Sequence, residues 1–179
     1  MLREGSELTV RAADRGDADQ IATVHVASWR AGYAGIFPAE WLESDEFDQG
    51  RRERWAQWRV GAGERIAVAV AAEVEAFSWF GPERDRGRTP AGRGEINAFY
   101  AHPRVWGTGV ADALMEHTEL RLRTEGFPTA VLWVLTDNPR ARRFYERHGW
   151  QPTGIEAEFE AAGVRAPEVE YRKDLEARP

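Results

Sequence analysis

A glycine-rich segment between a strand-like run and a helix-like run constrains the fold of this 179-residue chain more than any other feature. The segment covers residues 104–111 (RVWGTGVA), follows the apolar run 95–101, and leads into a helical pattern that continues to residue 125. Such a junction exposes backbone N–H groups at a helix N-terminus, where they bind anions, most often phosphate. Gly107 and Gly109 let the backbone approach a ligand without an intervening Cβ. The sequence therefore predicts a site for a phosphorylated ligand.

Two common phosphate-binding motifs do not fit this segment. A P-loop requires a Lys followed by Ser or Thr after its last glycine, but the only Lys of the chain is Lys173. A dinucleotide fingerprint requires a third glycine, and Asp112 occupies that position. A carboxylate in the first helical turn would also lie close to the phosphates. A nucleotide-binding protein of another fold is thus disfavoured, although it stays an alternative that ligand competition would test.

The remaining sequence predicts alternating strands and helices without an internal repeat or a long linker. Apolar or alternating runs predict strands, and amphipathic runs with capping residues predict helices. The expected strands are 8–11, 66–72, 73–80, 95–101, 129–135, about 154–161 and 168–173, and the expected helices begin near 14, 38, 47, 110 and 138. Residues 81–94, with four Gly and four Arg, predict an exposed, mobile loop. The order β-α-α-β-β-β-α-β-α-β-β predicts a mixed α/β sheet with helices on both faces, formed by one domain over residues 1–179.

Composition excludes several classes of function. No run of about 18 apolar residues could span a membrane, and the first residues lack the apolar core of a signal peptide, so we expect a cytoplasmic protein. The net charge of −6 disfavours nucleic-acid binding. The absence of Cys excludes disulfides and a Cys nucleophile, and the four His lack ligand spacing, so no metal site is predicted.

The glycine-rich segment resembles the acetyl-CoA motif of the GCN5-related N-acetyltransferase (GNAT) family, [QR]-x-x-G-x-[GA]. Arg104, Gly107 and Gly109 occupy the matching positions, and Asn138 and Tyr145 fall where the family places its next cofactor contacts. The resemblance extends from residue 8 to about residue 175. It implies the GNAT fold, with acetyl-CoA as cosubstrate and no metal. It also implies transfer of the acetyl group to a primary amine of a small molecule or peptide. Closing strands of this family often form dimers, so it further implies a homodimer.

The resemblance also implies roles for individual residues. Glu95 is the candidate general base, acting directly or through water, because an amine with a pKa of about 10 must lose a proton before it attacks a thioester. Tyr145 is the candidate general acid for the departing thiolate. A backbone N–H near Tyr100 would stabilise the oxyanion. The expected acetyl-CoA contacts are Phe99, Tyr100, Ala101, Arg104, Val105, Trp106, Gly107, Thr108, Gly109, Val110, Ala111, Asn138 and Arg142.

The first helix, the loop after it and the third strand are expected to form the acceptor site. Its candidate residues are Trp29, Arg30, Tyr33, Phe37 and Trp79, with Trp41, Trp55 and Trp58 as further lining, although core packing is the better explanation for any single Trp. Direct attack in a ternary complex is expected, since the chain has neither a Cys nor a G-x-S-x-G nucleophile elbow. Two alternatives stay open: a non-catalytic acetyl-CoA-binding or sensor module, and a protein N-terminus or lysine as the acceptor.

Overall fold

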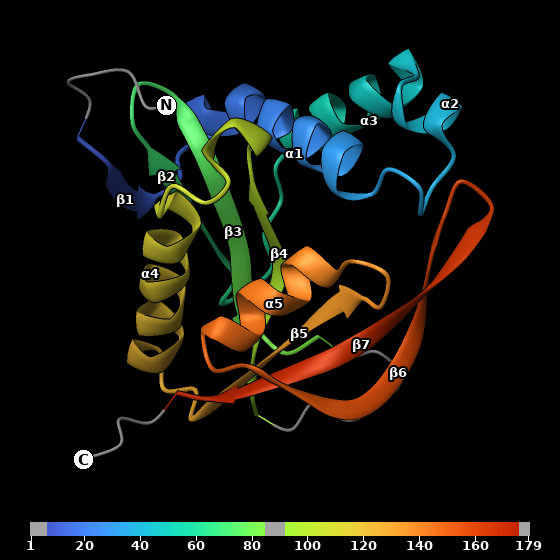
Figure 1. The fold of residues 1–179 in the computed structure, drawn as a ribbon. Coiled ribbons are helices and arrows are strands. Elements are labelled where there is room, and N and C mark those ends of the chain that lie inside the picture. Colours follow the sequence, from blue (N-terminus) through green and yellow to red (C-terminus); the bar gives the residue numbers. More distant parts are fainter. Residues whose placement is uncertain (1–6, 85–91, 176–179) are drawn as a thin grey trace.

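The computed structural model describes residues 7–84 and 92–175, which form a twisted sheet with helices on both faces (Figure 1). In chain order the elements are β1 (Thr9–Ala12), η1 (Arg15–Asp17), α1 (Ala18–Gly32), α2 (Ala39–Leu42), α3 (Asp45–Ala56), β2 (Arg65–Val70), β3 (Val74–Pro82), β4 (Gly94–Ala101), η2 (Pro103–Val105), α4 (Val110–Thr124), β5 (Thr129–Leu135), α5 (Pro139–Arg147), β6 (Gln151–Ala161) and β7 (Val164–Asp174).

The seven strands are ordered β1-β2-β3-β4-β5-β7-β6. Of these neighbouring pairs only β4 and β5 are parallel, and α4 makes the crossover between them. Strands β1 to β4 form an antiparallel meander, and the last two strands return as a hairpin in which β7 inserts beside β5. The single parallel junction therefore lies in the interior of the sheet.

Alternation along β2 shows how the two faces of the sheet are covered. Ile66 and Val68 pack in one hydrophobic cluster with residues of α1 and α3. Ala67 and Ala69 point to the opposite face, where α4 and α5 cover a second cluster. Because successive side chains of a strand point to opposite faces, two apolar faces require a layer of helices on each side.

Local sequence explains where the helices begin. Asp14 and Asp17 form a capping box at η1, which leads directly into α1. Asn138 caps α5 by accepting a hydrogen bond from the Ala141 N–H, and Pro139 occupies the first helical turn. These caps match the sequence signals at both positions. None of the helices in the described ranges is long and apolar enough to cross a membrane.

The expected mixed α/β fold is confirmed, with differences at the ends of elements. Three helices precede β2, close to the three places where the sequence predicts them, although the expected order of elements counted only two. Strand β6 begins at Gln151, earlier than expected, and bulges near Gly154, which has a φ of +83°. The expected loop 81–94 is shorter than predicted: Gly81 and Pro82 belong to β3, Gly94 belongs to β4, and residues 85–91 lie outside the described part.

Candidate active site

The parallel strands β4 and β5 separate partway along the sheet. Their pairing begins at Gly94–Ala130 and ends at Ile96–Leu132, whereas β3 stays paired with β4 as far as Ala101. From residue 97 onward, the side of β4 that faces β5 therefore has no neighbouring strand. A ligand that offers amide groups in an extended chain can take that place.

A bulge in β4 lies at the point where the two strands separate. Trp79 of β3 pairs with Ala98, and the next residue, Phe80, pairs with Ile96, so Asn97 is the extra residue. The side-chain oxygen of Asn97 is buried and has no hydrogen-bond partner in the described residues. At the far end of the opening, the Ala101 carbonyl accepts hydrogen bonds from the Ser28 hydroxyl at 2.9 Å and from the Trp106 indole N–H at 2.8 Å.

The glycine-rich turn presents free amides to the same opening. Gly107 and Gly109 have φ angles of +78° and +91°, and an added Cβ would meet nothing within 4 Å at either position. No side chain caps α4, whose first backbone hydrogen bond joins the Ala113 N–H to the Gly109 carbonyl. The amides of Gly107, Gly109, Val110 and Ala111 therefore make no hydrogen bond within the described residues, and they suit a phosphate.

Other amides of the predicted segment are already used inside the turn. The N–H groups of Val105, Trp106 and Thr108 bond to carbonyls three residues earlier, and the Arg104 N–H bonds to the His102 imidazole. The prediction that the whole segment donates to the ligand is thus too broad. The Thr108 hydroxyl also turns inward, to the Val105 carbonyl at 2.8 Å.

The Arg104 side chain points away from the opening between β4 and β5. Its guanidinium pairs with Glu75 at 2.8 Å and with Glu73 at 2.9 Å, both on or beside β3. Arg104 also lines none of the cavities described below. Arg104 therefore links the glycine-rich turn to the sheet through ion pairs, and its side chain is not placed to contact a ligand in the opening.

Helix α5 lines the opposite side of the opening. Tyr145 is buried and contacts the ring of Phe99, at 6.4 Å between ring centroids. Arg140 stacks on the Trp106 ring. Arg142 points to β7, where it donates to the Tyr171 hydroxyl at 3.0 Å, so the expectation that it contacts the cofactor is not supported. Positions 140, 143 and 147 share the face of the helix that lines the groove, and position 142 lies about half a turn away.

Three connected cavities run from the glycine-rich turn through the sheet. The first, of about 310 Å³, lies between this turn and the arginine face of α5. It shares Phe99, Trp106, Arg140 and Tyr145 with a narrow passage of about 120 Å³ between β4 and β5. The passage shares Asn97, Ala98 and Tyr100 with a third cavity, of about 650 Å³, on the face covered by α1 and α3. The shared residues place the three cavities next to one another, from one face of the sheet to the other.

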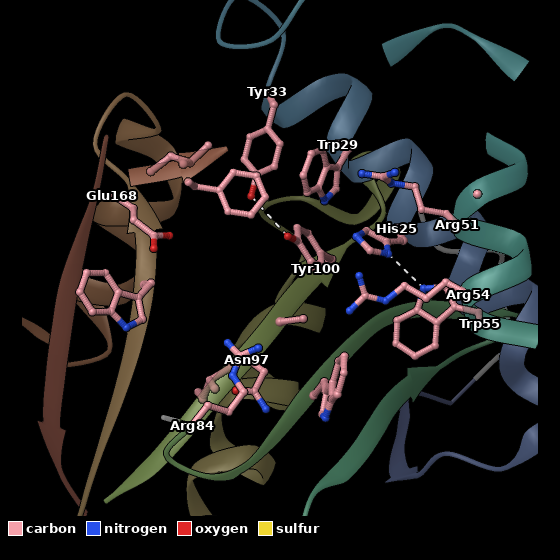
Figure 2. Close-up of a pocket in the computed structure, with 17 residues that line it drawn as sticks. His25, Trp29, Tyr33, Arg51, Arg54, Trp55, Arg84, Asn97, Tyr100 and Glu168 are labelled. Atoms are coloured by element: carbon pink, nitrogen blue, oxygen red, sulfur yellow. Dashed lines mark hydrogen bonds between the residues drawn. The ribbon is translucent and has the colours of Figure 1, made fainter. Parts of the chain in front are cut away.

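The third cavity, the acceptor cavity, is shown in Figure 2. Helices α1 and α3 and strands β3, β4, β5, β6 and β7 contribute to its wall. The lining residues are His25, Trp29, Tyr33, Gly50, Arg51, Arg54, Trp55, Trp79, Arg84, Ile96, Asn97, Ala98, Tyr100, Trp133, Leu135, Phe159 and Glu168.

Three of the five expected acceptor residues line this cavity: Trp29, Tyr33 and Trp79. Phe37 does not, because it is buried in a hydrophobic cluster beneath Trp29. Arg30 does not either, because its guanidinium bonds to the Leu42 carbonyl at 2.8 Å.

Of the three tryptophans expected as further lining of the acceptor site, two line a cavity and one does not. Trp55 lines the acceptor cavity, and Trp58 lines an adjoining hollow. Trp41 lines neither of them and packs against Phe47.

Glu95 is placed differently from the expectation for a directly acting base. Its side chain is only 1% exposed and lines none of the three cavities. One carboxylate oxygen accepts the Arg84 backbone N–H and the other accepts the Arg84 guanidinium, both at 2.8 Å. Direct contact with an amine in the acceptor cavity therefore has no geometric support, and the role of Glu95 through water stays a prediction.

Burial keeps the ionisable rings of the site neutral. Burial raises the pKa of Tyr145 well above its usual range, with the nearby Tyr100 adding to the effect, so the phenol keeps its proton. Burial likewise lowers the pKa of His25 to about 3, helped by the positive charges of Arg51 and Arg54. The site thus holds a neutral phenol and a neutral imidazole.

Several charged or polar residues of the acceptor cavity were not predicted from the sequence, five of which matter for its chemistry. Glu168 of β7 lines the acceptor cavity, and Asn97 forms the bulge. Arg51, Arg54 and Arg84 add positive charge to the wall. Only Asn97 had a local signal, a polar residue in the middle of an apolar strand; the other four depend on how distant elements dock.

Comparison with known proteins identifies the family. A family model described as the acetyltransferase (GNAT) family matches residues 23–150. The chain belongs to the GNAT family. It is therefore an acyltransferase of the N-acetyltransferase type, as the fold and the glycine-rich turn indicated.

Individual relatives agree with this assignment. The chain is 33% identical over 162 residues to the uncharacterized N-acetyltransferase YuaI of Bacillus subtilis, with 90% of each protein covered. Its fold is similar to that of the PaiA N-acetyltransferase of Thermoplasma acidophilum in complex with coenzyme A, with a TM-score of 0.70, 16% identity, and 94% and 99% of the two chains covered. It is also similar to yncA, a putative acetyltransferase of Salmonella typhimurium solved with acetyl-CoA, with a TM-score of 0.64, 19% identity and 97% of each chain covered.

Proposed function

We propose that this protein, acting as a single domain, transfers the acetyl group of acetyl-CoA to the primary amine of a small molecule by direct attack in a ternary complex. The observation that carries the proposal is the gap between β4 and β5, which lies between a phosphate-type site on one face of the sheet and the acceptor cavity on the other. Acetyl-CoA has matching parts: a pyrophosphate, an extended amide-containing arm and a terminal thioester. Two structurally similar proteins were solved with CoA or acetyl-CoA.

The residues of the gap fit acetyl-CoA. The free amides of Gly107, Gly109, Val110 and Ala111 would hold the pyrophosphate, as at other helix N-termini. Arg143 and Arg147 line the same end of the groove and add positive charge. The unpaired side of β4 would hydrogen bond to the amides of the pantetheine arm. Asn138 lines the passage with its side-chain NH₂ still available, since its oxygen is used by the helix cap.

The chemical step follows from this arrangement. The neutral amine attacks the thioester carbonyl carbon, and the C–S bond breaks as the tetrahedral intermediate collapses. A backbone N–H of β4 next to the bulge would stabilise the oxyanion. Tyr145, which faces the passage and keeps its proton, would protonate the departing thiolate sulfur.

Two carboxylates are candidates for accepting the proton of the amine. Glu95 would act through a water, since its carboxylate is buried beside Arg84. Glu168 has the more direct route, because it lines the acceptor cavity opposite α3. Its backbone position beside Leu135 places it on the β5 side of the gap.

Release of free thiol from acetyl-CoA, measured with a broad panel of amines, tests the proposed function. The chain has no Cys, so its own thiol background is zero. Turnover with an amine class and formation of the N-acetyl product would support the proposal. Binding of acetyl-CoA without turnover of any amine would favour the non-catalytic sensor module, and acetylation confined to peptides would favour a protein acceptor.

A homodimer and a cytoplasmic location also stay proposals. Strand β6 forms one edge of the sheet and its residues 151–156 are exposed, which leaves an edge that a second copy could cover. Light scattering on the purified protein would give the oligomeric state, and cell fractionation would give the compartment.

A further inference from the structure

Two arginines on one face of α3 have no acidic partner in the acceptor cavity. Arg51 and Arg54 lie three residues apart, so both side chains project from the same side of the helix toward the cavity (Figure 2). No carboxylate of the described residues lies within 4 Å of either guanidinium. Arg84, the third arginine of the wall, differs because it is paired with Glu95. The wall formed by α3 is thus positively charged in a protein whose net charge is −6.

The surroundings of Arg51 are those of a binding group. Its guanidinium lies over the rings of Phe47, at 3.6 Å, and Trp29, at 4.5 Å, and its buried Nε has no hydrogen-bond partner in the described residues. Burial is the main cause that lowers its pKa, to about 10, which shows that the cation is poorly solvated. Arg51 is half-buried, and a partly desolvated charge without a carboxylate partner in the described residues is costly, so an anion in the cavity would reduce that cost.

Arg52, between the two, has a different environment. It points to α1, where it pairs with Asp19 at 2.7 Å and with Asp48 of its own helix. Within the described residues, α3 therefore pairs its outward arginine with carboxylates, whereas its two cavity-facing arginines have no carboxylate partner. This contrast is expected if the partner of Arg51 and Arg54 is the substrate.

The opposite side of the cavity has the complementary charge. Glu168 is the only carboxylate among the described residues that line the cavity, and Figure 2 places it across from Arg51 and Arg54. Asn97 and Tyr100, at the mouth of the passage, lie between the two sides. An acceptor whose amine lies near the passage and Glu168 would extend its other end toward α3.

We propose that the acceptor is a small amine that also carries an oxyanion group, as an α-amino acid does, and that Arg51 and Arg54 bind this oxyanion. Arginine pairs with carboxylates and phosphorus oxyacids through two parallel hydrogen bonds, which fixes orientation as well as affinity. A polyamine would meet two cations at the same wall and is excluded by this arrangement. The inference rests on the proposed acetyltransferase function and names the substrate class of that site.

Matched pairs of amines test the inference. Each pair consists of an α-amino acid and the amine left after its decarboxylation, and an α-aminophosphonate of the same side chain separates carboxylate from phosphorus oxyacid. For the wild-type protein, kcat/KM for thiol release is expected to be roughly 10- to 100-fold higher with the acid-bearing member, the range of a charge-assisted hydrogen bond. Equal or reversed preference would overturn the inference while leaving an acetyltransferase.

Variants of α3 assign the preference to the two arginines. Arg51→Gln and Arg54→Gln should each remove most of the preference, because kcat/KM should fall much more for the acid-bearing member of a pair than for the acid-free amine. Arg54→Glu should shift it toward diamines. Arg52→Gln is the matched control and should keep the wild-type preference, since its side chain is outside the cavity. Arg51 packs on aromatic rings, so its replacement could disturb folding. Arg54 is more exposed, and its variant tests the assignment without this complication. If both variants keep the wild-type preference, the assignment is refuted.

Direct binding separates this inference from the proposed function. Trp29, Trp55 and Trp79 line the cavity, so their fluorescence reports binding of each member of a pair in the presence of CoA. Acid-selective binding that is lost in Arg54→Gln, without turnover of any amine, would uphold the inference and refute the catalytic function. Absence of acid-selective binding across the panel would refute the inference.

Discussion

Lowering the pH should destabilise the folded protein through the buried imidazole of His25. The side chain is 8% exposed and stacks on Tyr100 at 4.8 Å between ring centroids. The Trp55 indole N–H donates to Nδ1 of His25 at 3.0 Å, so this nitrogen must be unprotonated in the folded protein. Protonation would therefore break the hydrogen bond and place a third cation beside Arg51 and Arg54.

The sign and size of the effect follow from the pKa of His25. Burial lowers it from the ordinary 6.5 to about 3 in the folded protein. Below about pH 6.5 His25 therefore binds a proton in the unfolded chain but not in the folded protein. The free energy of unfolding consequently falls as the pH is lowered from about 6.5 toward 3. Each pH unit in this window costs about 1.4 kcal/mol, so acidification from pH 7.5 to 4.5 should cost about 3 kcal/mol through His25 alone.

Urea unfolding of the wild type and of His25→Gln at several pH values between 4.5 and 7.5 measures this contribution. The variant is expected to be less stable at pH 7.5, because Trp55 loses its imidazole partner, but its stability should fall less steeply with acid. His117→Gln is a control: that imidazole is only half-buried, on α4, and its loss should leave most of the pH dependence. Parallel pH profiles for the wild type and His25→Gln would show that His25 titrates normally and refute the reasoning.

The remaining predictions concern catalysis and acetyl-CoA binding. Tyr145→Phe should lower kcat by about 100-fold or more while the KM for acetyl-CoA stays nearly unchanged, because only the hydroxyl of a packed ring is removed; an unchanged kcat would exclude the phenol as the acid. Gly109→Ala places a side chain at a φ of +91°, which costs about 1–2 kcal/mol, so acetyl-CoA affinity and thermal stability should fall together, as calorimetry would show. Replacement of Glu168 by Gln should lower kcat by about 100-fold in the thiol-release assay, as expected if the carboxylate that lines the cavity accepts the proton of the amine. The same loss in Glu95→Gln, with Glu168→Gln nearly as active as the wild type, would instead establish the relay through water.

The sequence predicts the fold well because its signals are local. The caps at Asp14 and Asn138 and the glycines of the turn each act within a few residues, and the structure has them where expected. The wrong expectation that Arg142 contacts the cofactor could have been avoided by the same local reasoning. When helical positions are counted from Asn138, Arg140 lies on the same face of α5 as Phe144, and Arg142 lies on a different face.

Long-range packing decides the parts of the site that the sequence could not predict. The ion pair between Glu95 and Arg84 forms where the β3–β4 connection returns to the sheet, and no periodicity indicates it. The charged wall of the acceptor cavity requires α3 to dock beside α1, which depends on contacts between Trp55 and His25 that are 30 residues apart. The sequence of α3 shows only a largely polar helix and does not indicate that its Arg51 and Arg54 line the acceptor cavity.

The early end of the β4–β5 ladder gives this protein an edge strand in the middle of its sheet. Residues 97–101 line the passage along their unpaired side, and the Ser28 hydroxyl and the Trp106 indole N–H already donate to the last carbonyl, that of Ala101. An extended arm of acetyl-CoA would therefore complete the sheet as an additional, non-peptide strand. Amide hydrogen exchange across β4 should slow when acetyl-CoA binds, so that the cosubstrate acts as part of the folded architecture as well as the source of the acetyl group.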